Sequence, residues 1–425
     1  MMKKQLVVII IVFFIFSCRN ENKNKIIFDQ KPVPKLAMTE AEVYDKVLGM
    51  MVGSGIGDAM GAPTEMWSRD AIQLEYGFVD KLDSMVREPS PEGTWKINLP
   101  AGGTTDDSRW KVLTAQYLLT QNQDLNATDF ASFIMKKYKS DVENFKKIDA
   151  FSPEPYEENT RKMAWLQEWA LVAKPFVVKD YIAYNKALSR FYGGEMVCGG
   201  MLYAPAIGVF YPKNPLKAYN ETYKISIFDI GYARDISGLV AAMTAAAIDK
   251  NATKESVLDV LRSIDPEGFF KSRLVGRTSY RILRDALFIS KQAKAISVIN
   301  EKLPKAKRLK ANALYISQMY EAFRLLDEKN QDMPFHAGEI HLQVLTAMIF
   351  SDFDFEKTMA FLVNLGRDND TTSAVAGGIL GAFYGYEKLP NEMKTKVMKV
   401  GKQQLDIDFE DIARKLTKKI IERES

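Results

Sequence analysis

Helix start signals followed by apolar residues at helical spacing recur along this chain from residue 39 onward. Thr39-Glu40-Ala41-Glu42 has the pattern of a capping box, and Asn214-Pro215 pairs an N-cap with a proline suited to a first helical position. Thr253 and Asp354 precede apolar-periodic segments, the second of which ends at Gly366. The 3.6-residue period also fits five further stretches: 155–173, 180–191, 277–293, 311–327 and 408–421.

Alternating patterns typical of strands are scarce, apart from short pieces such as Phe176–Val178. Hydrophobic residues make up 47% of the 425 residues, which is ample material for a buried core. The sequence therefore predicts an all-α fold, with residues 39–425 forming one large helical bundle. The sequence does not decide whether this bundle also contains a small insertion lobe.

The N-terminal segment has the features of an export signal. Lys3 and Lys4 precede an apolar run, Leu6–Phe16, which is too short to span a bilayer. The run leads into Ser17-Cys18, a pattern typical of a bacterial lipobox. We predict a signal peptide over 1–17 and lipidation of Cys18, with an ordinary secretory signal and a chance cysteine as the alternative.

The polar residues 18–38 carry Pro32 and Pro34 and are interpreted as a flexible tether. The expected location is the bacterial cell envelope, where the lipid anchor would supply the only membrane contact. The sequence does not distinguish a periplasmic location from one on the cell surface.

Charge and cysteine content exclude several classes of function. The formal net charge of +4 is too small over 425 residues to indicate nucleic-acid binding. Two Cys and two His rule out a disulfide scaffold and argue against a zinc site, so oxygen ligands would hold any metal. Cys198 has no histidine near it in the sequence, and it is interpreted as a small buried hydrophobe rather than a nucleophile.

Two glycine-containing loops carry paired carboxylates at the start of a helix-like run. They are Ala101–Ser108, with Thr-Asp-Asp, and Gly366–Thr372, with Asp-x-Asp-Thr. One such loop would ordinarily be a helix cap, but two of them in one chain favour a shared site. Four clustered carboxylates need a counter-charge, and two hard divalent cations would provide it, Mg²⁺ first, with Mn²⁺ or Ca²⁺ as alternatives.

A third segment, 53–65, resembles a dinucleotide-binding G-x-G-x-x-G motif, but no strand-like run precedes it. Its small residues Gly53, Gly57 and Gly61 share one helical face, which predicts close contact with another helix. Asp58 and Glu65 then become candidate acids near the end of a packed helix.

Taken together, these segments resemble the ADP-ribosylglycohydrolase family in order and spacing over roughly 45–390. Three motifs carry the likeness: Gly57-Asp58-Ala59-Met60-Gly61-Ala62-Pro63-Thr64-Glu65, Thr105-Asp106-Asp107 and Gly366-Arg367-Asp368-Asn369-Asp370-Thr371. The small-residue run Gly377–Gly385 and the segment Gly199–Gly208 are also similar to family segments, the second to the one that lines the substrate cleft.

The resemblance implies an all-α fold with a binuclear magnesium site that cleaves ADP-ribose from a side chain or another acceptor, through an oxocarbenium-like state. It implies six metal ligands: Thr105, Asp106, Asp107, Asp368, Asp370 and Thr371. Glu65 and Asp107 are the candidates for handling the proton of the attacking water, and the choice between them is open. The candidates for substrate binding are Asp58, Gly199, Gly200 and Met201.

The sequence departs from the family pattern at two places. Leu202 stands where the family often has arginine, and the helix start at Arg234-Asp235 lacks the family's histidine. A related hydrolase of another extracellular sugar or nucleoside is therefore the alternative function. A non-catalytic binding protein is a third hypothesis, although all six ligand positions hold competent residues. The expected partner is a ribosyl substrate, either free or linked to a side chain, and the expected oligomeric state is a monomer.

Two further segments are interpreted mainly as structural. The aromatic residues over 151–192 are expected to lie in the core, with one or two near Gly193-Gly194 lining a cleft. The basic run Lys302–Lys310 is interpreted as a solvated face, with membrane-surface contact as the alternative.

Overall fold

The computed structural model describes residues 36–86, 98–146 and 155–424. The predicted signal peptide, Cys18 and nearly all of the tether lie outside these residues. Lys35–Ser425 form one compact unit, and its described residues make seventeen α-helices, four 3-10 helices and only two isolated β-bridges. The all-α prediction is confirmed, and the described residues of this unit do not divide off a separate lobe. Within them, no helix is both long and apolar enough to cross a membrane.

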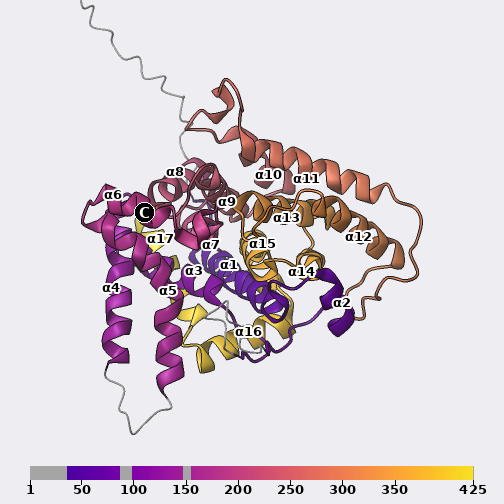
Figure 1. Ribbon diagram of the computed structural model, residues 1–425, viewed down its shortest axis with the longest axis horizontal. Coiled ribbons are helices and arrows are strands. Elements are labelled where there is room, and N and C mark those ends of the chain that lie inside the picture. The colour runs from indigo at the N-terminus through magenta and orange to yellow at the C-terminus, as the bar shows by residue number, and fades with distance from the viewer. Residues whose placement is uncertain (1–35, 87–97, 147–154, 425) are drawn as a thin grey trace, which may run out of the picture. The chain divides into compact units, whose positions relative to one another are not determined.

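The helices follow one another along the chain as shown in Figure 1. The first part contains α1 (Glu40–Gly61), η1 (Ala62–Thr64), α2 (Arg69–Tyr76), α3 (Asp106–Leu119) and α4 (Ala127–Phe145). The middle part contains α5 (Pro155–Val177), α6 (Tyr181–Leu188), η2 (Phe191–Gly194), α7 (Gly199–Phe210), α8 (Pro215–Ile225), α9 (Ala233–Ala247) and α10 (Lys254–Ser263). The last part contains η3 (Phe269–Lys271), α11 (Thr278–Lys294), α12 (Ala313–Asp327), α13 (Ala337–Phe350), α14 (Phe355–Leu365), α15 (Asn369–Tyr384), η4 (Tyr386–Lys388), α16 (Asn391–Gln404) and α17 (Phe409–Glu424).

The predicted caps start the helices as expected. Thr39 forms the full capping box at α1, and Thr253 forms one with Ser256 at α10. The Asp354 side chain accepts the first-turn N–H of α14, and that helix ends at Gly366, whose φ of 86° favours glycine. The strand-like pattern at Phe176–Val178 was misleading, because α5 continues to Val177 and no described strand lies beside it to pair with.

Helices α1 and α15 pack against each other with their backbones in contact. A Cβ atom added at Gly53 would lie 2.5 Å from the Gly377 carbonyl oxygen, and one at Gly57 would lie 2.0 Å from the Ser373 carbonyl oxygen. Only glycine fits at such a crossing, which confirms the close helix contact expected from the sequence. At the end of α1, a Cβ at Gly61 would lie 2.4 Å from the Asp370 Cα, so the end of α1 meets the start of α15.

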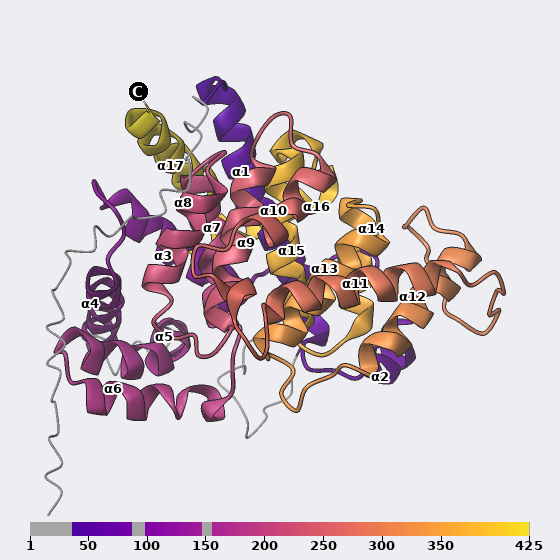
Figure 2. The ribbon, with the colours of Figure 1, turned by 90° about the horizontal axis from the view of Figure 1, so that it is seen from above.

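The other helices flank this central pair. Helices α3 and α7 pack against each other, and each also contacts both α1 and α15. Helices α4, α5 and α6 lie on one side of the pair, and α11, α12 and α13 lie on the other (Figures 1 and 2). The first turns of α3, α7 and α15 consequently converge near the end of α1.

Candidate active site

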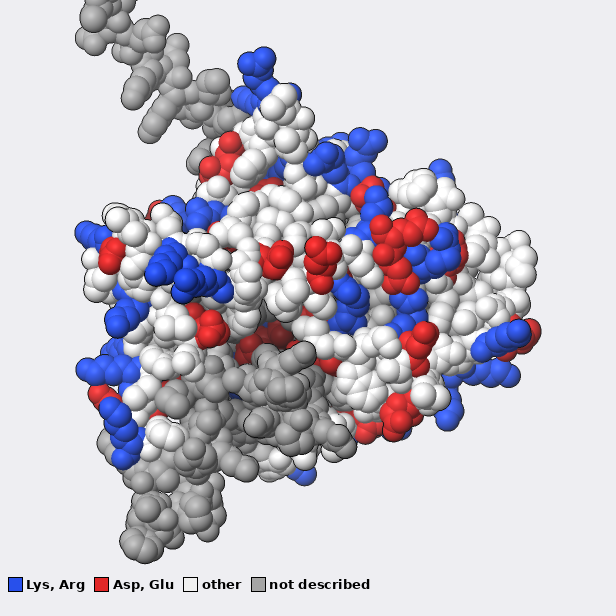
Figure 3. All heavy atoms as spheres, viewed as in Figure 1, with Lys and Arg blue, Asp and Glu red and all other residues white. Residues whose placement is uncertain are grey.

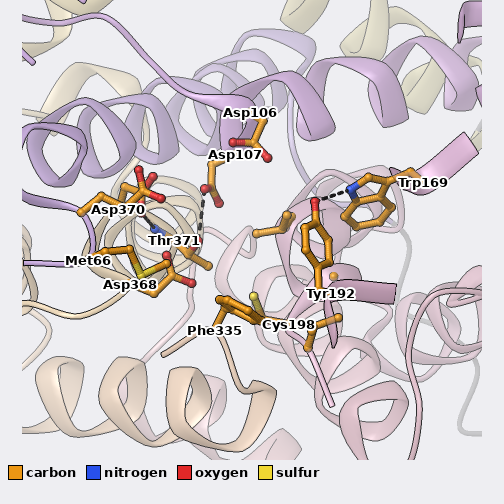
Figure 4. Close-up of a pocket in the computed structure, with 14 residues that line it drawn as sticks. Met66, Asp106, Asp107, Trp169, Tyr192, Cys198, Phe335, Asp368, Asp370 and Thr371 are labelled. Carbon is orange, nitrogen blue, oxygen red and sulfur yellow. Dashed lines mark hydrogen bonds between the residues drawn. The ribbon is translucent and has the colours of Figure 1, made fainter. Parts of the chain in front are cut away.

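A cavity of about 310 Å³ lies where these helix starts converge. A hollow in the middle of the face in Figure 3 contains acidic side chains. The close-up in Figure 4 shows carboxylates on one side of the cavity and aromatic rings on the other. The lining residues are Glu65, Met66, Asp106, Asp107, Trp169, Tyr192, Val197, Cys198, Gly199, Leu202, Phe335, Asp368, Asp370 and Thr371.

Five buried carboxylates from three separate segments line this cavity. Glu65 follows η1, Asp106 and Asp107 occupy the first turn of α3, and Asp368 and Asp370 flank the start of α15. Carboxylate oxygens of Glu65, Asp368 and Asp370 all lie within 4.8 Å of one another, a spacing at which they could hold a metal ion.

The six ligand candidates meet here. Asp106, Asp107, Asp368, Asp370 and Thr371 line the cavity directly. Thr105 lies beside them and donates its hydroxyl to Asp370 Oδ2 at 3.3 Å. The structure thus brings the two acidic loops together and adds Glu65 to the group.

Burial, with repulsion from neighbouring acids, makes the four aspartates of this group weak acids. Burial raises the pKa of Asp106 to about 7, with a further contribution from the neighbouring Glu65 charge. Burial likewise raises the pKa of Asp368 to about 6 and holds the pKa values of Asp107 and Asp370 well above their usual range. A cluster of this kind is poorly compensated by its own surroundings and would gain from a bound cation.

The hydrogen bonds of Asp107 leave one oxygen for a ligand. Thr371 Oγ1 donates to Asp107 Oδ2 at 3.2 Å, whereas the buried Oδ1 accepts no hydrogen bond from the residues that the structure describes. The buried Lys111 lies close by, but its Nζ donates to the main-chain oxygen of Asp107 at 3.1 Å. An unpartnered buried carboxylate oxygen among other acids fits the coordination of a hard divalent cation.

Asp58 lies behind the cavity and is not one of its lining residues. Its Oδ1 accepts the Thr105 N–H at 2.9 Å, and its Oδ2 accepts the Ser108 N–H at 3.0 Å and the Ser108 hydroxyl at 2.6 Å. These bonds fix the loop that presents Asp106 and Asp107. The geometry gives Asp58 a positioning role rather than the substrate contact suggested by the sequence.

The glycine segment at the start of α7 forms another part of the wall. Gly199 lines the cavity, while the Gly200 N–H donates to Asp229 Oδ1 at 2.8 Å and Met201 is fully buried. A Cβ at Gly200 would lie 2.2 Å from Asp229 Oδ2, which the Ser237 hydroxyl also approaches at 2.7 Å. Asp229, which the sequence analysis missed, therefore anchors this helix start.

The wall opposite the acids is largely aromatic. Tyr192, next to the Gly193-Gly194 turn, lines the cavity as expected for one of the aromatic residues, and it accepts a hydrogen bond from Trp169 Nε1 at 3.1 Å. Cys198 is buried, and burial raises the pKa of its thiol well above the usual range, in keeping with its interpretation as a small hydrophobe. Phe335 comes from the loop before α13, and nothing in the sequence marked it for this wall.

A partly buried ion pair supports the loop that carries Asp368. Arg367 donates from Nε and Nη2 to both carboxylate oxygens of Glu339 on α13, at 2.5 and 2.9 Å. Arg367 holds a φ of 62°, and its main-chain oxygen accepts the Met66 N–H at 2.7 Å. The ion pair thereby holds a strained loop that links Glu65 to Asp368.

Glu339→Gln is expected to weaken Mn²⁺ binding by about 10–100-fold. Arg367, once released from Glu339, would repel a metal ion bound at Asp368 and would no longer hold the loop in place. Titration calorimetry with Mn²⁺ measures the effect. Glu321→Gln, which weakens an exposed pair with Arg324, is the matched control and should leave the affinity unchanged. A Glu339→Gln protein with a lower unfolding midpoint and unchanged Mn²⁺ affinity would show that the pair supports only the fold.

In the presence of EDTA, the domain is expected to become more stable as the pH falls from about 8 to about 5. The carboxyls of Asp106 and Asp368 have pKa values of about 7 and about 6 in the folded state, against about 4 in an unfolded chain. The folded protein therefore binds more protons in this window, so the free energy of unfolding decreases as the pH rises. Urea unfolding at several pH values tests this, and added Mg²⁺ should reverse the trend by competing with protons. Stability that rises with pH in EDTA contradicts it.

Comparison with known proteins identifies the family. A sequence model described as ADP-ribosylglycohydrolase matches residues 39–425. The chain belongs to the ADP-ribosylglycohydrolase family. As a member of this family, it is a glycosyl hydrolase of the ADP-ribosyl type.

Two curated relatives and one solved structure show how far the likeness extends. The chain is 21% identical to "Uncharacterized protein YegU" of Escherichia coli (strain K12), over 90% of this chain and 99% of the relative. It is 22% identical to "ADP-ribosyl-[dinitrogen reductase] glycohydrolase" of Rhodospirillum rubrum, over 86% and 95%. A solved structure titled "ADP-ribosylglycohydrolase-related protein complex" has a TM-score of 0.54 and 17% identity, and covers 89% of this chain and 99% of its own. That similarity supports the fold.

The two departures from the family pattern occupy different positions in this ADP-ribosylglycohydrolase fold. Leu202 lines the cavity, so its apolar side chain contributes directly to the site. The Arg234 guanidinium instead lies 5.3 Å from the centre of the Tyr223 ring, and Arg234 is not a lining residue.

Proposed function

We propose that the chain hydrolyses an N- or O-glycosidic bond of an ADP-ribosyl or related ribosyl group, with two divalent cations, Mg²⁺ first, held by the acidic side of the cavity. The observation that carries this proposal is the meeting of five buried carboxylates from three distant segments. The unpartnered Asp107 Oδ1 and the raised pKa values of the cluster support cation binding.

Each residue has a separate task in this proposal. Thr105, Asp106, Asp107, Asp368, Asp370 and Thr371 hold the cations, with Asp58 keeping the α3 loop in place. When bound, the cations supply charge compensation and polarise the sugar hydroxyls and a water molecule. Glu65 or Asp107 takes a proton from the attacking water as the water oxygen bonds to the anomeric carbon and the glycosidic bond breaks, and that proton passes to the leaving nitrogen or oxygen.

The substrate would lie between the two walls of the cavity. The ribose meets the acidic side, and the group joined to it faces Trp169, Tyr192 and Phe335, whose rings suit a planar partner. Leu202 favours a second candidate, hydrolysis of a nucleoside or another sugar compound, because it adds apolar surface where the family often has an arginine.

We also propose that the protein is a monomer fixed to the cell envelope by a lipid on Cys18. The lipobox-like Ile15-Phe16-Ser17-Cys18 and the apolar run before it support this location. Mass spectrometry of the membrane fraction, comparing the native chain with Cys18→Ser, tests the lipid anchor.

Turnover by the compact unit 35–425 tests the proposed reaction. ADP-ribosyl-arginine, ADP-ribosyl-serine and simple nucleosides are offered with Mg²⁺ or with EDTA. Release of free ADP-ribose that depends on Mg²⁺ is the expected result. Release of a base from nucleosides alone would select the second candidate, and no turnover of either ADP-ribosyl substrate with Mg²⁺ bound would exclude the first.

A further inference from the structure

An exposed surface that is both apolar and basic lies on the loop before α11 and on that helix. In the loop, Phe270, Leu274 and Val275 are 42%, 95% and 53% exposed. On the helix, Leu287 and Phe288 are 46% and 58% exposed. Five large apolar side chains exposed within twenty residues are unusual for a surface that contacts only water.

The amphipathic pattern of α11 places Leu287 and Phe288 on the side of the helix that faces away from the bundle. Its buried residues, which face the bundle, are Ser279, Leu283, Ala286, Ile289, Ser290 and Ala293. At 100° per residue, the outer side holds a stripe about 120° wide that contains Arg281, Arg284, Leu287, Phe288 and Lys291. The apolar and basic residues are therefore neighbours on the same stripe.

The loop is held against the beginning of this stripe. The Phe270 ring packs edge-on against Tyr280, with ring centres 5.2 Å apart, and Tyr280 lies seven residues before Leu287 on the same side of α11. The Asp265 carboxylate accepts the N–H groups of Phe269 and Phe270 at 2.9 and 3.0 Å, which fixes the turn. We call the loop 269–275 and the stripe together the α11 face.

The α11 face carries an excess of positive charge. Its exposed cations are Lys271, Arg273, Arg281, Arg284 and Lys291, and none of them forms an ion pair with an acid that the structure describes. Among nearby acids, Asp285 is paired with Lys329 and Asp259 with Arg262, and Glu267 is exposed just before the loop. Figure 3 shows basic side chains along the upper edge, where this loop lies in Figure 1.

We propose that the α11 face binds an anionic lipid bilayer. Cations that surround exposed apolar tips match such a surface, because the cations meet the phosphate groups while the apolar side chains enter the headgroup boundary. The centre of a protein–protein interface is instead depleted of charge, which makes a protein the weaker choice of partner.

Binding in this way would leave the cavity accessible. The acidic hollow lies in the middle of the face shown in Figure 3, whereas the loop lies at its upper edge. The contact adds to any lipid on Cys18, and it would fix the orientation of the domain on the membrane.

Co-sedimentation of the unit 35–425 with lipid vesicles tests the proposal, and it is independent of both the anchor and the proposed reaction. Binding is expected with vesicles of phosphatidylcholine and phosphatidylglycerol, but not with phosphatidylcholine alone. Lys271→Glu/Arg273→Glu is expected to lower the partition coefficient at least about 25-fold, since each surface cation contributes about fivefold. Leu274→Asp should also release the protein, and turnover of a soluble substrate should stay unchanged in both variants.

Two matched control variants separate the effect of the α11 face on vesicle binding from general effects of surface charge and hydrophobicity. Lys302→Glu/Lys305→Glu makes the same charge change in another exposed basic loop, and Leu74→Asp alters an apolar side chain that is 89% exposed on α2. Both should change binding less than about twofold. Failure to sediment with phosphatidylglycerol vesicles, or equal losses in the controls and the α11-face variants, would overturn the proposal.

Discussion

Asp370→Ala is expected to lower turnover by about 10³-fold, equivalent to about 4 kcal/mol, and to weaken Mn²⁺ binding by at least about 100-fold. Carboxylate oxygens of Asp370, Glu65 and Asp368 lie within 4.8 Å of one another, and Thr105 Oγ1 donates a hydrogen bond to Asp370 Oδ2. Steady-state kinetics and calorimetric titration measure the two effects.

The same variant distinguishes a lost site from a lost fold. Burial, together with the neighbouring acidic charges, raises the pKa of Asp370, so its removal relieves an unfavourable buried carboxyl group when EDTA is present. The metal-free Asp370→Ala domain should therefore unfold at the same or a higher urea concentration than the native domain. Glu75→Ala, at an exposed position on α2, is the control and should change neither activity nor affinity. Native turnover and native Mn²⁺ affinity in Asp370→Ala would end the two-metal hypothesis.

Glu65→Gln is expected to lower kcat by about 10²–10⁴-fold while Mn²⁺ affinity falls less than about tenfold. The amide keeps the size of the side chain and an oxygen that can contact a cation, but it cannot take a proton from water at neutral pH. Glu65 lies in the acidic cluster, close enough to raise the pKa of Asp106 through its charge.

Asp107→Asn is the companion variant for this assignment. The unpartnered Oδ1 of Asp107 makes it a ligand candidate, so this change should weaken both Mn²⁺ binding and turnover. If Glu65→Gln lost affinity and turnover in parallel while Asp107→Asn lost only turnover, the proton-transfer role would belong to Asp107 and Glu65 would be the ligand.

The sequence by itself determined the helices and the chemistry of the acidic loops. Capping residues such as Thr39 and Thr253 act on N–H groups two or three residues away, so their effect can be read locally. The spacing of Gly53, Gly57 and Gly61 indicated a helix that touches another backbone, because only glycine permits that approach. The Thr-Asp-Asp and Asp-x-Asp-Thr motifs likewise marked the carboxylates that the fold brings into the cavity.

Tertiary structure alone decided what each of these residues faces. Asp58 and Glu65 belong to one motif, yet the packing of α1 against α15 places Asp58 under the α3 loop and Glu65 in the cavity. Glu339 and Arg367 are separated by 28 residues, and Phe335 reaches a wall built mostly by residues 169–202. Such pairings depend on how distant helices pack, and a local pattern holds no information about a partner that only the folded core brings within a few ångströms.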